Sequence, residues 1–157
     1  MESNNALTDV LNDLVQINND RIAGYEKAIK DSKPEDVGFH SMFRRMIDES
    51  SKYKSELISA INTLGGEANI RSTTNSGKVY RVWMDIKSTF TGKSELSVLE
   101  LCEYGEDAAQ KAYEEALKSD VNMPASIREL LVTQKEQLRN SHDTIKRQRD
   151  LHAVEHH

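Results

Sequence analysis

Residues 7–29, LTDVLNDLVQINNDRIAGYEKAI, decide the fold class of this chain. Two polar residues in this stretch, Asn18 and Arg21, lie on the same face as its apolar residues, which is the face predicted to be buried. The apolar residues recur every three or four positions, as on one side of an α-helix: Leu7, Val10, Leu11, Leu14, Ile17, Ile22, Tyr25, Ala28 and Ile29. The pattern predicts one long amphipathic helix over residues 5–30, packed against neighbouring helices.

Three further segments carry a stripe of apolar or small residues at the same spacing: residues 34–64, 95–118 and 124–152. Ser32 and Glu35 have the spacing of a capping box before the second helix. Gly65 and Gly66 are a strong signal for its end. Pro124 suits the first turn of the last helix. The sequence therefore predicts four long helices.

The lengths of the connections predict how these helices are arranged. Short connections join the first helix to the second and the third to the fourth, which makes each pair antiparallel. Residues 67–94 are a long connection that can hold a crossover, and residues 78–90 within it are amphipathic. We expect an all-α, antiparallel four-helix bundle with an extra short helix in this crossover. Residues 1–152 would form a single domain, and residues 153–157 a disordered tail or a tag remnant.

Composition restricts the class of protein. The chain has 157 residues, a net charge of −5 and one cysteine. This fits one domain and allows neither an intrachain disulfide nor a cysteine-based zinc site. The acidic balance argues against a nucleic-acid surface, and no apolar run reaches the length of a membrane span. Because the first residues also lack the features of a signal peptide, we expect a cytoplasmic protein that binds neither nucleic acid nor membranes.

Four stretches carry a resemblance to a known family: residues 18–25 (NNDRIAGY), 81–87 (RVWMDIK), 102–109 (CEYGEDAA) and 112–117 (AYEEAL). Together they resemble a bacterial family of ferritin-like four-helix bundles, the domain of unknown function 2383. The resemblance covers nearly the whole chain. It implies a ferritin-like bundle in which a helix-bearing crossover joins the second and third helices. It implies no activity, because a fold does not by itself transfer function.

A dinuclear metal centre is the chemistry that such a fold first suggests. Ferritin-like carboxylate proteins use one Glu on each of two helices and Glu-x-x-His on each of the other two. No Glu-x-x-His occurs in this sequence, and Glu26 and Glu106 lie only at the margins of their stripes. We therefore predict no metal and no cofactor. A metal-binding or oxidase bundle remains an alternative, with the fallback ligands Glu26, Glu49, Glu106 and His142.

Polar residues on the apolar stripes form a second candidate site: Asn18, Ser50, Gln134 and Ser141. Buried amides and hydroxyls need hydrogen-bond partners, so we expect a network across the helices that fixes their register. The alternative is a pocket in the bundle core that carries a small molecule. Cys102 lies among small residues on the inner face of its helix, where a buried, unreactive thiol is expected rather than a nucleophile.

The predicted crossover helix offers a candidate surface for another protein. Trp83 faces the bundle in this prediction, whereas Tyr80 and Met84 lie partly off that face. No nucleotide-binding loop and no nucleophile-elbow motif occurs in the chain. The leading hypothesis is a non-enzymatic structural or protein-interaction bundle that forms a homo-oligomer. Its alternatives are the metal-binding bundle and the small-molecule carrier.

Overall fold

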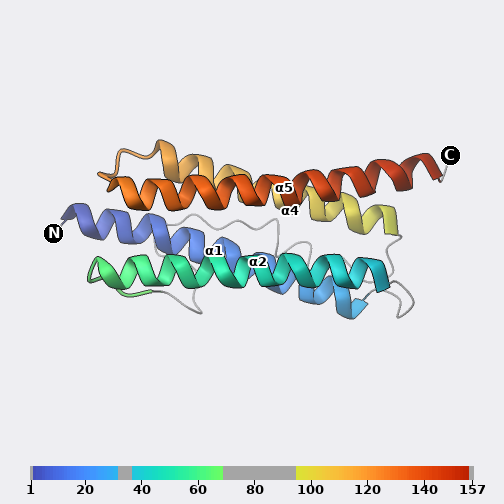
Figure 1. The fold of residues 1–157 in the computed structure, drawn as a ribbon, viewed down its shortest axis with the longest axis horizontal. Coiled ribbons are helices and arrows are strands. Elements are labelled where there is room, and N and C mark those ends of the chain that lie inside the picture. The colour runs from blue at the N-terminus through green and yellow to red at the C-terminus, as the bar shows by residue number, and fades with distance from the viewer. Residues whose placement is uncertain (1, 32–36, 69–94, 156–157) are drawn as a thin grey trace.

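The structure is a computed structural model that describes residues 2–31, 37–68 and 95–155. It contains four helices: α1 (Glu2–Asp31), α2 (Val37–Thr63), α4 (Glu95–Lys118) and α5 (Ala125–Glu155). Figure 1 shows the helices lying along one axis, with α1 and α5 running in one direction and α2 and α4 in the other. The described residues contain no strand. The predicted all-α four-helix bundle is confirmed.

The helix limits lie close to those that the stripes predict. α4 covers the predicted residues 95–118, and α5 continues to Glu155, beyond the predicted end at residue 152. The expected short helix of residues 78–90, with Tyr80, Trp83 and Met84, lies outside the described residues. The expected capping box of Ser32 and Glu35 does too. These features stay predictions.

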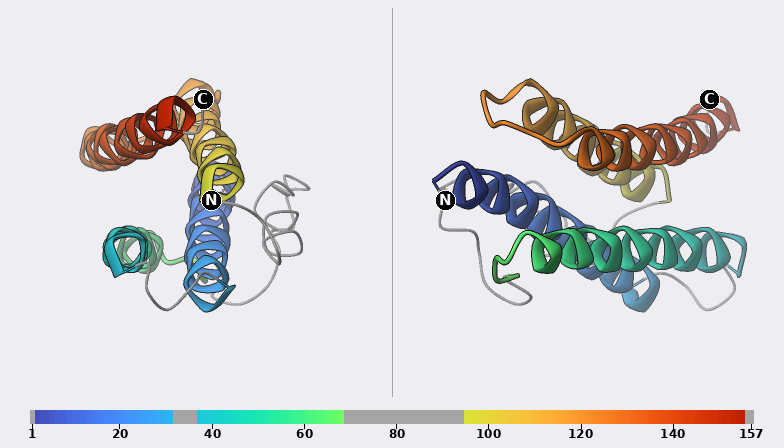
Figure 2. Two further views of the ribbon diagram at one scale, coloured as in Figure 1. Left: turned by 90° about the vertical axis from the view of Figure 1, so that its right-hand side faces the viewer. Right: turned by 60° about the vertical axis from the view of Figure 1, so that its left-hand side comes forward.

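The bundle consists of two antiparallel hairpins. α1 packs along α2 and α4 packs along α5, whereas the contacts between the hairpins are mainly those of α1 with α4. Figure 2 shows α1 and α4 adjacent to each other in the end-on view. α2 and α5 approach each other less closely. The two hairpins therefore meet tightly along one side and more openly along the other.

The turn after α2 directs the chain toward α1. Gly65 has a φ of 79°, a left-handed conformation that favours glycine. The backbone N–H of Gly66 donates to the Ile61 carbonyl at 3.0 Å, which closes the helix end. A side chain at Gly66 would meet Thr8 of α1 at 2.6 Å, and the Asn12 amide donates to the Glu67 carbonyl at 3.0 Å. The predicted stop at the two glycines is confirmed.

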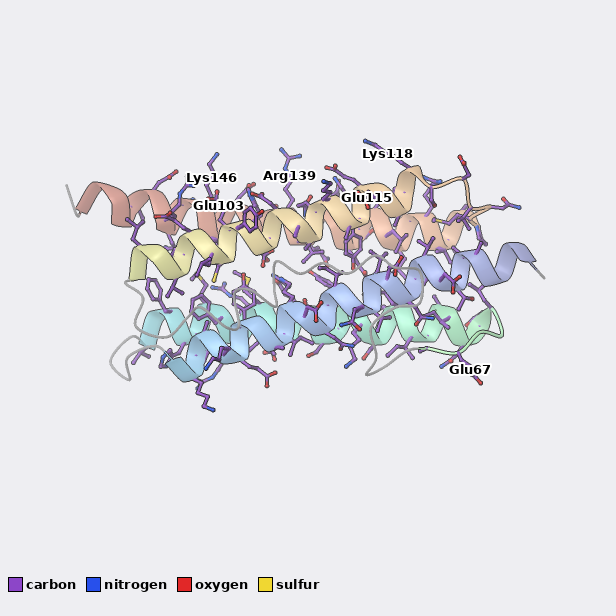
Figure 3. All side chains as sticks on the ribbon, turned by 180° about the vertical axis from the view of Figure 1, so that it is seen from behind. Glu67, Glu103, Glu115, Lys118, Arg139 and Lys146 are labelled. Carbon is purple, nitrogen blue, oxygen red and sulfur yellow. The ribbon has the colours of Figure 1, made fainter. Side chains whose placement is uncertain are left out.

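The core is formed by the predicted stripes and runs along the whole bundle. Its largest fully buried side chains include aromatic residues from three helices, Tyr25, Phe43, Tyr53 and Tyr113. α1 is the most enclosed helix, since every residue of the run 11–15 is buried. Charged side chains such as Arg139 and Lys146 point away from the bundle (Figure 3). In the described part of the chain, no helix is apolar over a length that would cross a membrane.

Candidate functional site

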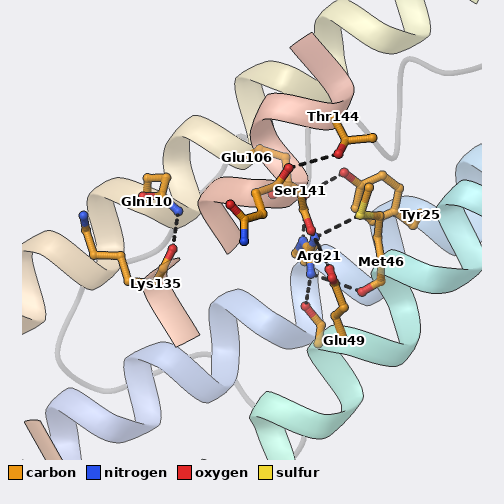
Figure 4. Close-up of polar contacts among 11 residues, drawn as sticks. Arg21, Tyr25, Met46, Glu49, Glu106, Gln110, Lys135, Ser141 and Thr144 are labelled. Atoms are coloured by element: carbon orange, nitrogen blue, oxygen red, sulfur yellow. Dashed lines mark hydrogen bonds and ion pairs between the residues drawn. The ribbon is translucent and has the colours of Figure 1, made fainter. Parts of the chain in front are cut away.

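A buried arginine lies at the centre of the bundle. The Arg21 side chain comes from α1 and is 0% exposed. Its Nε donates to Glu106 Oε1 of α4 at 2.7 Å, and its Nη2 donates to Glu49 Oε1 of α2 at 3.2 Å. Its Nη1 donates to the Ser50 hydroxyl at 2.8 Å and to the Met46 carbonyl at 3.1 Å. Figure 4 shows the guanidinium among these groups, which together use its forked set of donors.

Glu106 is the fully buried partner of this arginine. Its Oε1 accepts from Arg21 and also from the Tyr25 hydroxyl, at 2.5 Å. Its other oxygen, Oε2, is buried and has no hydrogen-bond partner among the described groups. The sequence placed Glu106 at the margin of its stripe, but the structure places it inside. The physical reason is that α4 packs against both α5 and α1, so its buried face is wider than one stripe.

The charges in this cluster shift the titration of their neighbours. Burial alone would lower the pKa of Arg21, but Glu106, Tyr25 and Glu49 together raise that pKa above its ordinary value. Burial, and then the nearby Glu106 carboxylate, raise the pKa of the Tyr25 phenol. The same two causes raise the pKa of the Cys102 thiol, which is 0% exposed. The expected burial of Cys102 is confirmed, and its thiol stays protonated near neutral pH.

A second polar network connects all four helices and lies seven residues away from the arginine cluster on α2, α4 and α5. The Asn18 amide of α1 donates to the Tyr113 hydroxyl of α4 at 3.0 Å. That hydroxyl donates to Gln134 Oε1 of α5 at 2.6 Å. The Gln134 Nε2 then donates to the Tyr53 carbonyl at 3.2 Å and to Glu56 Oε1 at 3.0 Å, both on α2. Burial raises the pKa of Tyr113 and outweighs the lowering effect of its Asn18 hydrogen bond.

The structure thus divides the four predicted polar residues between two networks. Asn18 and Gln134 are joined through Tyr113. Ser50 and Ser141 belong to the arginine cluster, where the Ser141 hydroxyl donates to Glu49 Oε1 at 2.7 Å. The sequence pattern did not identify Arg21 as the centre of a buried hydrogen-bond cluster. Its signal was present, because an arginine in the middle of an apolar stripe needs buried acceptors.

The fallback metal ligands are not gathered into one site. Glu26 is exposed on α1, while Glu49 and Glu106 both accept from Arg21. His142 lies near the surface of α5, with its Nε2 2.7 Å from Asp107 Oδ1. Within residues 2–31, 37–68 and 95–155, no three His, Cys, Asp or Glu side chains form a group that could hold a metal ion.

The donor set at the bundle centre does not fit a dinuclear metal site. Such a site combines four carboxylates with two imidazoles. Here two carboxylates, Glu49 and Glu106, share one internal cation, Arg21, with a serine and a methionine beside it. The geometry can hold four helices in one register, and it offers a metal no set of free ligands among these residues.

Comparisons with known proteins agree on the fold. The profile of the domain of unknown function 2383 matches residues 6–119. A search of curated proteins found no match. Among solved structures, a mutant of Mycobacterium smegmatis Dps1 has a TM-score of 0.72, covering 94% of this chain and 97% of that chain at 14% sequence identity. At this identity, the likeness shows a ferritin-like fold and nothing about activity.

Proposed function

Because this chain belongs to the family of the domain of unknown function 2383, to which no activity is assigned, we propose its function from the geometry of its core. We propose a non-enzymatic structural or protein-interaction bundle that works in the cytoplasm as a homo-oligomer. It would use no metal or other cofactor, and it would bind neither nucleic acid nor membranes.

The observation that carries this proposal is the buried guanidinium of Arg21. It neutralises the two carboxylates that reach the centre of the bundle, Glu106 and Glu49, at 2.7 and 3.2 Å. A divalent ion placed between the same carboxylates would lie next to this cation, in a region where repulsion between charges is strong. It would also have to replace the hydrogen bonds that now satisfy the guanidinium. The interior is therefore better suited to holding the bundle together than to metal chemistry.

Two potentially reactive groups beside this cluster also support a structural role. The Cys102 thiol is fully buried, and its raised pKa keeps it in the poorly nucleophilic protonated form. The Tyr25 phenol donates to Glu106, and its pKa is raised as well. A single buried thiol is also typical of a protein from a reducing compartment, which favours the cytoplasm.

Exposed apolar side chains support a function through protein contacts. Val37 and Tyr104 are 64% and 62% exposed, and Val132 and Leu151 are also exposed. Tyrosine is enriched at protein interfaces because it combines a large apolar surface with a polar tip. With the core occupied by its own polar networks, the outer surface is where this bundle would meet a partner.

Native mass spectrometry of the tag-free protein tests this proposal in one experiment. The protein is purified from cells grown in medium rich in iron and manganese. We expect assemblies of two or more chains, with far less than one metal ion per chain. A monomer at tens of micromolar would contradict the oligomer. Stoichiometric metal that is lost in Glu106→Gln, but kept in the surface control Glu114→Gln, would instead establish the metal-binding alternative.

A further inference from the structure

Two polar bridges between α2 and α5 lie seven residues apart on each helix. Glu49 accepts from the Ser141 hydroxyl at 2.7 Å, and Glu56 accepts from the Gln134 amide at 3.0 Å. Because the two helices are antiparallel, one heptad forward on α2 corresponds to one heptad back on α5. The next opposed pair in this series is Thr63 and Ile127, which cannot form a similar bridge.

A groove opens where the third bridge would stand. It has a volume of about 590 Å³ and lies between the end of α2 and the start of α5. Thr63 and Ile127 both line it, and the Thr63 hydroxyl is turned back to the Ser59 carbonyl at 2.9 Å. Most of its lining is apolar, with contributions from Ala60, Leu64, Ile127 and Leu130.

Residues 65–68, which follow α2, leave this groove open. After α2 the backbone turns toward α1, where Asn12 donates to the Glu67 carbonyl and Gly66 lies against Thr8. The groove lies on the side of α2 that faces α5. The turn that ends α2 therefore packs on α1 and does not fill the space beside Ile127.

Glu56 supplies one fixed negative charge to the apolar groove. It is part of the groove lining, and its Oε1 accepts from Gln134. Gln134 is itself held in place, because its carbonyl accepts from the buried Tyr113 hydroxyl and its amide also donates to the Tyr53 carbonyl. No ion-pair partner of Glu56 occurs among the described side chains. The carboxylate is thus oriented but not neutralised.

We propose that this groove binds a small molecule that carries a protonated amine on an apolar body. The amine would donate to the Glu56 carboxylate, and the apolar part would lie against Ala60, Leu64, Ile127 and Leu130. The groove volume falls within the range of roughly 300–1,000 Å³ that is common for small-molecule sites. A few oriented polar groups in an apolar lining are also typical of such sites. The binding of such a molecule goes beyond the proposed structural function and does not depend on it.

The probes are hexylamine, hexan-1-ol and hexanoate, which share one apolar chain and differ in their polar group. Each is titrated into the full-length ¹⁵N-labelled protein at neutral pH, and amide shifts are followed by NMR. We expect hexylamine to bind most tightly and hexanoate least. The shifted amides should cluster at the end of α2, around Ala60 and Leu64, and at the start of α5, around Ile127 and Leu130.

Two variants test the contacts. Glu56→Gln keeps a carbonyl acceptor for Gln134 but removes the charge, and it should weaken hexylamine binding about tenfold or more, as for loss of a charged hydrogen bond. Ala60→Leu should abolish binding by filling the groove. Glu114→Gln, on α4, is the matched charge control and should leave the affinity unchanged. Thermal melting of each variant verifies that it is folded.

The proposal is overturned if hexanoate binds as tightly as hexylamine, or if Glu56→Gln retains the wild-type affinity. Shifts that map away from the groove would overturn it as well. If none of the three probes binds but a lysine-containing amphipathic peptide does, the small-molecule site is refuted and the groove belongs to a protein partner. These results are independent of the oligomer mass and metal content that test the proposed function.

Discussion

Replacing Arg21 with methionine removes a buried cation from the bundle centre while keeping a long, largely apolar side chain. The Glu106 carboxylate would lose its partner at 2.7 Å and keep, among the described side chains, the Tyr25 hydroxyl as its donor. Its Oε2 already has no described partner. The loss of the ion pair with Glu49 would be less destabilising, because the Glu49 side chain is 29% exposed and can be solvated.

The expected loss in the free energy of unfolding follows from the burial of Arg21 and Glu106. Both Arg21 and Glu106 are 0% exposed, and breaking a fully buried pair by removing one side costs about 3–5 kcal/mol. The lost contact with the partly exposed Glu49 adds little, since such pairs contribute roughly 0–1 kcal/mol. Against a typical domain stability of about 5–15 kcal/mol, Arg21→Met should remove a large fraction of the free energy of unfolding.

The decisive comparison is with the double variant Arg21→Met/Glu106→Gln. The glutamine keeps an acceptor for Tyr25 and carries no charge, so the double variant should be more stable than Arg21→Met by about 2 kcal/mol. Urea unfolding followed by far-UV circular dichroism gives these free energies, provided the m-values stay equal. Arg139→Met, at an exposed position, is the control and should change stability by less than about 0.5 kcal/mol.

A loss of less than about 1 kcal/mol of unfolding free energy in Arg21→Met would contradict a stabilising role of the Arg21–Glu106 pair. A double variant that is no more stable than Arg21→Met would contradict this role as well. Either result would mean that the folded protein does not depend on the guanidinium to stabilise Glu106.

Three further predictions concern the reactivity of the Cys102 thiol, its effect on stability at alkaline pH, and the glycine turn. Cys102 should react slowly with a thiol reagent in native buffer and promptly in denaturant, because it is fully buried; fast native labelling would contradict the orientation of α4. The raised folded-state pKa of Cys102 gives stability that is full below its unfolded pKa of about 9.0 and is lost as pH rises above it. Cys102→Ala should therefore reduce the loss of stability at alkaline pH by up to about 1.4 kcal/mol per pH unit; an unchanged pH dependence in this variant would contradict the prediction. Gly65→Ala should destabilise by about 1–2 kcal/mol through its φ of 79°, as read from the urea midpoint; an unchanged midpoint would show that the turn can relax.

The sequence was sufficient for the helices because their stripes encode the angle of each residue around its axis. The sequence was less informative about the position of each residue along the bundle axis. Asn18, Ser50, Gln134 and Ser141 all face inward as their stripes predict, yet they form two separate layers. Which residues share a layer depends on how far each helix is shifted along its neighbours, and periodicity does not specify that shift.

Arg21 and Glu106 show a second limit of the pattern. An arginine on a stripe often extends its charged end to solvent, so its position alone did not identify a buried ion pair. Glu106 becomes interior only because α1 covers a side of α4 that the α4 stripe does not mark. Tyr113 was recognisable as a flanking residue, but its role as the link between Asn18 and Gln134 requires the positions of three helices.

The distribution of charge between the hairpins has a consequence for folding order. Arg21 has acceptors within its own hairpin, Ser50, Glu49 and the Met46 carbonyl, whereas the donors to Glu106 all belong to the other hairpin. The α1–α2 hairpin can therefore form from local contacts, with the Nη1 and Nη2 groups of Arg21 already hydrogen-bonded. In the undocked α4–α5 hairpin the Glu106 carboxylate lacks these donors and is hydrated by water, which it must lose when α1 packs against α4. A docking register shifted by one turn would bury this carboxylate without its pairing to the Arg21 guanidinium, so such misaligned encounters should dissociate before the two hairpins pack together.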